Sequence, residues 1–504
     1  MEKIRILQLG KTDFSRQYEI YPDAVWFYEP DISEKPKQDY DMAILDRSIT
    51  EAEGTYIYRF VRAYCLFYLE DVEINDTVER LLFSKRGSKV RRDQLAYFLK
   101  NEPHHYFAKP YGEKFRPDKL TVARGFRGKV RWNGCMDLTL EGDYGDELNE
   151  IAYWRYNVPL FQNVYTDLWL EYEKTPGIEI ALKITEFAPG TVSDICQERI
   201  ISEEQLQDVV PITNLDGNTG AFISLLAKGE GKLSIIALHS RLSRNGRGCF
   251  LPGGERIVTS QREEAFFYFD PANMKPPLNV YFSGYKTQEG FEGFNMMRRL
   301  GCPFLLVSEA RLEGGAFYMG TPEYEEMFVK KLQSYLDILG FTRDQVIFSG
   351  LSMGTFGAMY YGCDIRPHAI LVGKPLASIG NVAYHTKTIR PGEFSTSLDV
   401  LRKHTGRVSP LSVPTLNERF WDRFDHADWG QTKFIAAYMI EDDYDAGAYQ
   451  TLISHLKDDG VQIIGKGLHG RHNDNTGGIV SWFISQYAAV LREDFGQFLD
   501  EPEE

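Results

Sequence analysis

The chain lacks any long apolar run. No uninterrupted hydrophobic stretch reaches the roughly 20 residues that a membrane-spanning helix needs. The first residues, Met1–Arg5, run directly into an apolar strand, without the apolar core and cleavage site of a signal peptide. We therefore expect a cytoplasmic protein whose membrane contact, where it occurs, is peripheral at the inner face of the cell membrane or through a partner.

Cysteine pairs and basic runs are also missing. The six cysteines are widely spaced, with no CxxC motif and no close Cys/His spacing, so we expect free thiols in a reducing compartment and no metal site. The formal net charge is -15, and the densest basic stretch, Lys85–Arg92, has the pattern of a solvated helical face. Because nucleic-acid binding usually requires a basic patch or stripe, we expect no nucleic acid partner.

Changes of pattern divide the chain, which we expect to be of the α/β class overall. Residues 1–115 combine short apolar strands with a mostly helical stretch over 51–115, which predicts a small α/β region. Residues 116–272 contain many short strands between turns, the last at 265–269, which predicts a β-sandwich. Residues 273–493 alternate strands with helices, which predicts a doubly wound parallel sheet. An acidic tail, 494–504, follows.

A serine lies between a strand and a helix in the third region. Val346–Ser349 is an apolar strand, Gly350–Gly354 has the sequence Gly-Leu-Ser-Met-Gly, and a helical run follows through Tyr361. This arrangement is typical of the nucleophile elbow of α/β hydrolases, in which the glycines let strand and helix approach each other. Ser352 is therefore the predicted nucleophile, and the C-terminal region is predicted to be α/β-hydrolase-like.

A serine nucleophile needs a general base and an orienting acid. In this fold the acid and then the histidine follow the serine along the chain. The acidic cluster 441–445 follows an apolar strand, and within it Asp442 is the predicted acid, with Asp443 as the alternative. His472 lies closer than His469 to the next helical segment and is the predicted base, with His469 as the alternative.

The predicted oxyanion hole uses two backbone N–H groups. One belongs to Met353, directly after the nucleophile, and the other to Tyr285, in a glycine-containing loop after the first strand of the region. An ordinary glycine turn is the alternative for that loop. With no metal-ligand set nearby, the predicted chemistry is metal-free acyl transfer, in which Ser352 attacks an ester or thioester and His472 shuttles the proton. Water or a sugar hydroxyl then completes the reaction.

Four segments, 4–10, 40–47, 349–358 and 442–445, form a specific combination. Through them the whole chain resembles the family of second accessory secretory proteins, which belong to the accessory Sec export system of Gram-positive bacteria. Each segment alone would be a weak signal, and their combination carries the resemblance.

The resemblance implies a function in exporting serine-rich repeat glycoprotein adhesins, together with the first and third accessory secretory proteins and the accessory export ATPase. It also implies O-acetylation of N-acetylglucosamine on the adhesin, with Ser352, Asp442 and His472 as the triad. Such an enzyme holds no resident cofactor but requires an acetyl donor, for which acetyl-CoA is a candidate. The β-rich middle would correspond to a carbohydrate-binding-like domain. A carbohydrate esterase and a non-catalytic export adaptor with a hydrolase fold stay open as alternatives.

Overall fold

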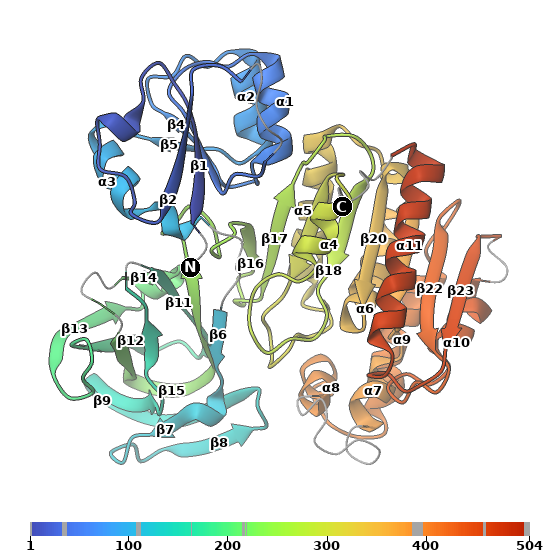
Figure 1. The fold of residues 1–504 in the computed structure, drawn as a ribbon. Coiled ribbons are helices and arrows are strands. Elements are labelled where there is room, and N and C mark those ends of the chain that lie inside the picture. Colours follow the sequence, from blue (N-terminus) through green and yellow to red (C-terminus); the bar gives the residue numbers. More distant parts are fainter. Residues whose placement is uncertain are drawn as a thin grey trace.

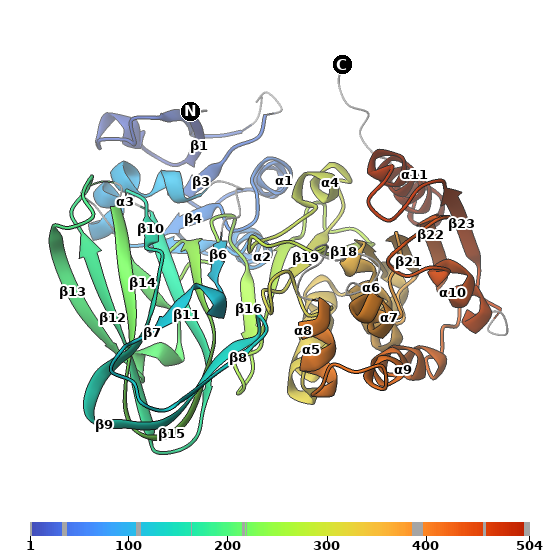
Figure 2. The same ribbon diagram turned by 90° about the horizontal axis from the view of Figure 1, so that it is seen from below.

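The computed structural model describes residues 3–497 except 33–37, 107–111, 163, 214–216, 218, 386–396 and 457–459. Its strands form a five-stranded, a ten-stranded and an eight-stranded sheet in chain order. Figures 1 and 2 show the first two sheets next to each other and on the same side of the third, beside its strands β16 (Glu255–Val258) and β17 (Glu264–Asp270). No helix within the described ranges combines the length and apolar character needed to cross a membrane.

The N-terminal sheet has the strand order β2-β1-β3-β4-β5, and every strand pair is parallel. Its three central strands are mostly buried, as expected for a parallel sheet covered on both faces, whereas the edge strands β2 and β5 are partly exposed. This confirms the small parallel sheet predicted for this region. The elements are β1 (Ile4–Leu9), β2 (Ala24–Glu29), β3 (Met42–Leu45), α1 (Glu51–Phe60), β4 (Leu66–Leu69), α2 (Asp76–Ser84), β5 (Ser88–Val90) and α3 (Leu95–Asn101).

Two details of this region differ from the sequence-based prediction. The stretch expected to be mostly helical is interrupted by β4 and β5, because short apolar runs fit a buried strand as well as a helix. The basic stretch is not a uniformly solvated face: the Lys85 side chain is 1% exposed and pairs with Asp270 at 3.1 Å. Lys85 therefore joins the N-terminal region to the C-terminal sheet.

The middle region, for which we predicted a β-sandwich, forms one hydrogen-bonded antiparallel sheet of ten strands. The long strands β9 and β15 pair with several partners each, and the register between them shifts at Leu225/Leu226 and on both sides of Gly229, which lies opposite Gly145. The buried residues of its strands form one hydrophobic core. The strands are β6 (Gly112–Phe115), β7 (Leu120–Val122), β8 (Lys129–Asn133), β9 (Asp137–Trp154), β10 (Val158–Leu160), β11 (Tyr165–Lys174), β12 (Ile178–Phe187), β13 (Ile195–Ser202), β14 (Val210–Ile212) and β15 (Thr219–Ser243).

The C-terminal sheet has the order β16-β17-β19-β18-β20-β21-β22-β23, and β17 is antiparallel to both of its neighbours. Strand 265–269, which we expected in the sandwich, is therefore part of this sheet as β17. The strands are β16 (Glu255–Val258), β17 (Glu264–Asp270), β18 (Leu278–Phe282), β19 (Phe304–Ser308), β20 (Val346–Leu351), β21 (Ala369–Gly373), β22 (Lys433–Met439) and β23 (Ile463–Leu468).

Helices cover both faces of this sheet. Alternate strand residues divide between two cores: Phe348 packs in the core with α5, α6 and α9, and Ile347 in the core with α4 and α11. This doubly wound arrangement confirms the pattern predicted from strand–helix alternation. The helices are α4 (Phe294–Arg299), α5 (Pro322–Leu339), α6 (Met353–Ile365), α7 (Ile379–His385), α8 (Ser397–Thr405), α9 (Ser412–Asp425), α10 (Ala448–Leu456) and α11 (Thr476–Phe495).

The predicted acidic tail begins later than 494. Asp494 lies in α11 and accepts hydrogen bonds from Lys433 at 2.7 Å, while its other contact is His368 at 2.8 Å. Residues 498–504 of the predicted tail lie outside the described residues.

Candidate active site

Ser352 occupies a tight turn between β20 and α6. Its backbone has φ 52° and ψ −121°, a conformation that costs a non-glycine residue on the order of 1–3 kcal/mol. The flanking glycines make this turn feasible. A Cβ on Gly354 would lie 2.0 Å from the carbonyl oxygen of Phe282, and a Cβ on Gly350 would lie 2.4 Å from the Gly354 carbonyl carbon. The sequence motif therefore has the strand–turn–helix geometry of a nucleophile elbow.

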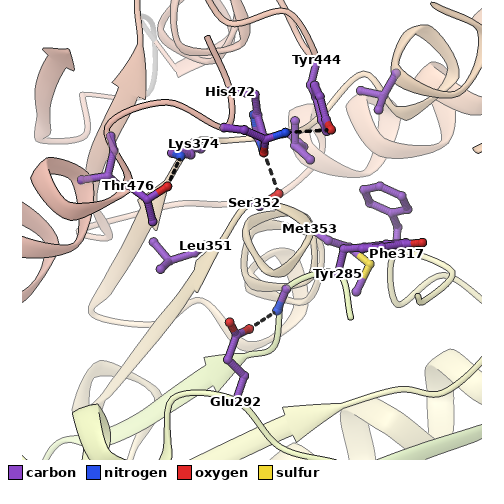
Figure 3. Close-up of a pocket in the computed structure, with 15 residues that line it drawn as sticks. Tyr285, Glu292, Phe317, Leu351, Ser352, Met353, Lys374, Tyr444, His472 and Thr476 are labelled. Carbon is purple, nitrogen blue, oxygen red and sulfur yellow. Dashed lines mark hydrogen bonds between the residues drawn. The ribbon is translucent and has the colours of Figure 1, made fainter. Parts of the chain in front are cut away.

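The structure brings Ser352, His472 and Asp442 into one hydrogen-bonded chain. The Ser352 Oγ lies 2.8 Å from His472 Nε2, and His472 Nδ1 lies 2.9 Å from Asp442 Oδ2. The His472 and Asp442 side chains are 2% and 7% exposed. Figure 3 shows the serine and the imidazole facing each other at the end of β20. This arrangement orients Nε2 to accept the serine proton.

The two candidate acids occupy different positions. Asp442 Oδ1 accepts the backbone N–H groups of Tyr444 at 2.8 Å and Asp445 at 3.2 Å, which leaves Oδ2 for the imidazole. Asp443 instead accepts the backbone N–H of His472 at 3.0 Å. The carboxylate on the imidazole is thus Asp442, and Asp443 holds the loop that carries the histidine.

His469, the alternative base, lies away from the nucleophile. Its side chain is 85% exposed and its Nδ1 lies 3.0 Å from the Glu441 carboxylate. Of the two histidines, only His472 contacts Ser352 in the structure.

An aromatic side chain that we did not predict packs on the imidazole. The Tyr444 ring stacks on His472 with centroids 4.2 Å apart and planes 4° from parallel. Together with Asp442 and Asp443, this stacking fixes the imidazole plane. Tyr444 lies within the acidic cluster 441–445 from which the acid was predicted. No pattern in the sequence indicates that its ring would stack on the histidine.

The two predicted oxyanion donors lie at the same pocket. Met353 is the first residue of α6. Its N–H is therefore one of the backbone donors at a helix start that have no acceptor within the helix. Tyr285 follows Gly284, whose N–H donates to Glu292 Oε2 at 2.6 Å. A Cβ at Gly284 would lie 3.2 Å from the Leu351 carbonyl oxygen, so the loop approaches the elbow closely.

The pocket above Ser352 has a volume of about 460 Å³. Its wall combines aromatic and aliphatic side chains with one carboxylate and one ammonium, and the residues that we had not predicted there include Glu292, Phe317 and Lys374. Burial lowers the pKa of Lys374, and the Asp442 and Asp474 carboxylates oppose that shift. Such a wall suits a ligand with both apolar and hydrogen-bonding groups. The pocket is lined by Gly284, Tyr285, Glu292, Phe317, Leu351, Ser352, Met353, Lys374, Leu376, Val382, Tyr444, His472, Asn473, Thr476 and Ile479.

The described residues contain no cluster of three or more His, Cys, Asp or Glu side chains arranged to hold a metal ion. The groups that meet at Ser352 are its own hydroxyl, the imidazole of His472 and, behind it, the carboxylate of Asp442.

The C-terminal part of the chain has a mixed α/β fold in which a serine lies at the turn between a strand and a helix of a doubly wound sheet, the position of the nucleophile in α/β hydrolases. Residues 4–497 match the model of the family described as "Accessory Sec system GspB-transporter". The chain belongs to this family, which confirms the resemblance seen in the sequence.

Individual relatives agree along the whole chain. An accessory Sec system protein of Streptococcus gordonii from this family is 36% identical over 506 residues, covering 98% of this chain and 99% of that protein. Its counterpart in Staphylococcus aureus (strain NCTC 8325 / PS 47) is 35% identical over 515 residues and covers 98% of each chain. A chain in the solved Glycosylation Associate Protein (Gap123) complex from Streptococcus agalactiae is 35% identical, with a TM-score of 0.88 and 99% coverage of both chains.

Proposed function

We propose that the protein is a serine-dependent O-acetyltransferase that modifies N-acetylglucosamine on serine-rich repeat glycoprotein adhesins and supports their export. The observation that carries the enzymatic part is the hydrogen-bonded chain from Ser352 through His472 to Asp442 at the floor of a pocket. The export part follows from membership of the accessory Sec family.

The proposed reaction has two steps. In the first, Ser352 Oγ attacks the acetyl carbonyl of the donor while His472 Nε2 takes the hydroxyl proton, and the N–H groups of Met353 and Tyr285 stabilise the oxyanion. The intermediate collapses to acetyl-Ser352, and His472 returns the proton to the leaving group. In the second, a sugar hydroxyl gives its proton to His472 and attacks the acetyl carbon, the bond from that carbon to Ser352 Oγ breaks, and Oγ takes the proton back from His472. The acetylated sugar leaves and Ser352 is regenerated. We propose acetyl-CoA as the donor.

The same protein would act as part of an assembly. One similar chain was solved in the Gap123 complex, and the family's association with accessory Sec export extends the proposal to the first and third accessory secretory proteins and the export ATPase. We propose that this assembly works in the cytoplasm, with peripheral contact at the inner face of the membrane.

The test replaces Ser352 by Ala and measures two outputs in cells: acetylation of the exported adhesin by glycopeptide mass spectrometry, and the amount exported. We expect acetylation to be lost and export to persist at least in part. The matched control is Ser485→Ala, on the exposed face of α11, which should change neither output. Unchanged acetylation in Ser352→Ala would contradict the enzymatic role and favour the adaptor alternative.

Purified protein separates transferase from esterase. With an acetylated glycopeptide and no donor, a deacetylase would remove the acetyl group, whereas the proposed transferase would add one to an unmodified glycopeptide when a donor is supplied. Net deacetylation with no transfer would contradict the proposal and favour the carbohydrate esterase.

A further inference from the structure

Lys374 directly follows β21, and the backbone around it is hydrogen-bonded both to β22 and to Ser352. Its N–H donates to the carbonyl of Ala437 in β22 at 2.7 Å, and the carbonyl of the preceding Gly373 accepts the N–H of Ser352 at 2.9 Å. The φ of Lys374 is 59°, in the left-handed region that non-glycine residues seldom adopt. Backbone strain of this kind, on the order of 1–3 kcal/mol, concentrates at functional sites.

The Lys374 side chain reaches the segment that follows the base. The residue is 6% exposed, and its Nζ donates to the backbone oxygen of Asp474 at 3.2 Å and to Thr476 Oγ1 at 2.9 Å. Figure 3 shows the bond to Thr476 beside the pocket. Asp474 and Thr476 lie in the segment that follows His472 in the chain. The ammonium therefore connects the loop that carries His472 to the end of β21.

A purely structural role accounts poorly for a lysine here. Burying a cation is costly when no carboxylate bonds to it directly. The two hydrogen-bond partners of this ammonium are neutral oxygens, one of a carbonyl and one of a hydroxyl, and the nearby Asp442 and Asp474 carboxylates oppose the effect of burial on its pKa without a hydrogen bond to it. A leucine or methionine would fill similar space without that cost. The ammonium offers directed hydrogen bonds to a loop that must hold the imidazole within about 3 Å of the nucleophile.

We propose that Lys374 is a positioning residue: by holding residues 474–476, it keeps His472 Nε2 in hydrogen-bonding reach of Ser352 Oγ. The effect of Lys374 on catalysis rests on the proposed function. The hydrogen bonds from Lys374 to Asp474 and Thr476, which we call the tether, can be tested without measuring turnover. Lys374 also lines the pocket, and the role proposed for it here is exerted through His472.

The kinetic test uses the whole protein and p-nitrophenyl acetate as the probe ester. We expect Lys374→Met to lower kcat by about tenfold or more with KM within about twofold, since a displaced base weakens the transition state and not ground-state binding. Thr476→Val removes one of the two bonds and should lower kcat by less. The double variant should be no slower than Lys374→Met alone, because both changes break the same tether. Lys433→Met, which breaks a lysine pair with Asp494 away from the pocket, is the matched control.

Hydrogen–deuterium exchange measures the tether directly. In Lys374→Met, we expect amide exchange over 470–478 to rise at least about tenfold while exchange in α10 stays unchanged. Unchanged exchange over 470–478 overturns the inference, as does an unaltered kcat or a double variant whose losses multiply. If the wild type fails to turn over the ester, the proposed function fails, and the exchange result still decides whether Lys374 holds the loop.

Discussion

At His472, three neighbours fix the imidazole in three different ways. The Asp442 carboxylate holds Nδ1, the Tyr444 ring covers one face, and the Asp443 carboxylate holds the backbone N–H. The first of these selects the tautomer that leaves Nε2 as an acceptor, and the other two restrict rotation and displacement. At the residue scale, the two adjacent aspartates therefore have unequal roles.

This assignment predicts unequal effects of two matched variants. Asp442→Asn should lower kcat by about 10³- to 10⁴-fold, because an amide on Nδ1 favours the wrong imidazole tautomer. Asp443→Asn keeps an acceptor for the His472 N–H and should lower kcat by no more than about tenfold. Steady-state turnover of a p-nitrophenyl ester measures both. An equal loss in the two variants, or a larger loss in Asp443→Asn, would contradict the unequal roles of the two carboxylates.

The nucleophile, base and acid could be predicted because chain order and motif context constrain them. A GxSxG between strand and helix, an acidic cluster after a strand and a later histidine are local features. Tyr444, Lys374 and Glu292 could not be predicted as site residues, because their positions depend on how separate loops fold over the sheet. The choice of Asp442 over Asp443 likewise depends on a turn in which Asp442 Oδ1 accepts two backbone N–H groups.

At the scale of elements, the elbow depends on how closely α6 approaches β18. The Cβ position of Gly354 lies 2.0 Å from a backbone oxygen of Phe282, and backbone cannot move aside as a flexible side chain can. The motif's glycine is therefore required by packing between two elements as well as by the turn itself.

A pair of glycine variants tests this requirement. Gly354→Ala should destabilise the protein by roughly 1–3 kcal/mol and reduce activity, because α6 must shift away from β18. Gly477→Ala in the first turn of α11 is the control, since its Cβ would meet open space, and a helical alanine should leave stability unchanged or raise it by about 0.5 kcal/mol. Urea unfolding of both variants gives the comparison. Wild-type stability of Gly354→Ala would contradict the close approach.

Helices and strands could be predicted where the hydrophobic pattern was strong. The sheet to which each strand belongs could not be predicted. Strands such as β20 and β22 are apolar runs bounded by turn residues, and they were located from sequence. The strand 265–269 was also located, but its pairing with β19 depends on residues far along the chain. β4 was missed because its four apolar residues follow a helical pattern.

At the scale of the whole molecule, buried charges join the sheets. Glu289, in the loop between β18 and α4, contacts His239 and Arg241 of β15, and Arg241 also binds Glu264 of β17 at 2.9 and 3.0 Å. Burial alone would raise the pKa of Glu289, but the charges of Arg241 and His239 outweigh burial and lower it to about 2. The loop that carries Tyr285 is thereby anchored to the middle sheet.

This network predicts a pH-dependent loss of stability in Glu289→Gln. Because the folded pKa lies below the unfolded value, the carboxylate stabilises the fold fully above the unfolded pKa, and that stabilisation fades as pH falls toward about 2. At pH 7 the variant should lose roughly 3–5 kcal/mol, since the buried Arg241 and His239 each lose one of their two carboxylate partners. The difference from wild type should narrow below about pH 4.5. Denaturant unfolding at several pH values measures the difference in unfolding free energy between variant and wild type. Glu493→Gln, at an exposed position, is the control. A difference that grows as the pH falls would contradict the network.

The arrangement of the three regions could be predicted only in outline. The two α/β regions follow from strand–helix alternation. For the middle region the sequence predicts strands but not their pairing, because pairing between distant segments leaves no local mark in the sequence. The 25 residues of β15 pair with several strands of the middle sheet, which no short-window pattern reveals.

The central claim is that Ser352 carries the acetyl group, and trapping the acetyl-enzyme tests it most directly. The protein is mixed with p-nitrophenyl acetate, quenched in acid within seconds, and digested for peptide mass spectrometry. The account predicts one acetyl group on Ser352 in the wild type, none at this position in Ser352→Ala, and its transfer to an N-acetylglucosamine-bearing peptide added before the quench. An unacetylated Ser352 in the wild type, or equal acetylation of that glycopeptide by Ser352→Ala, would contradict it.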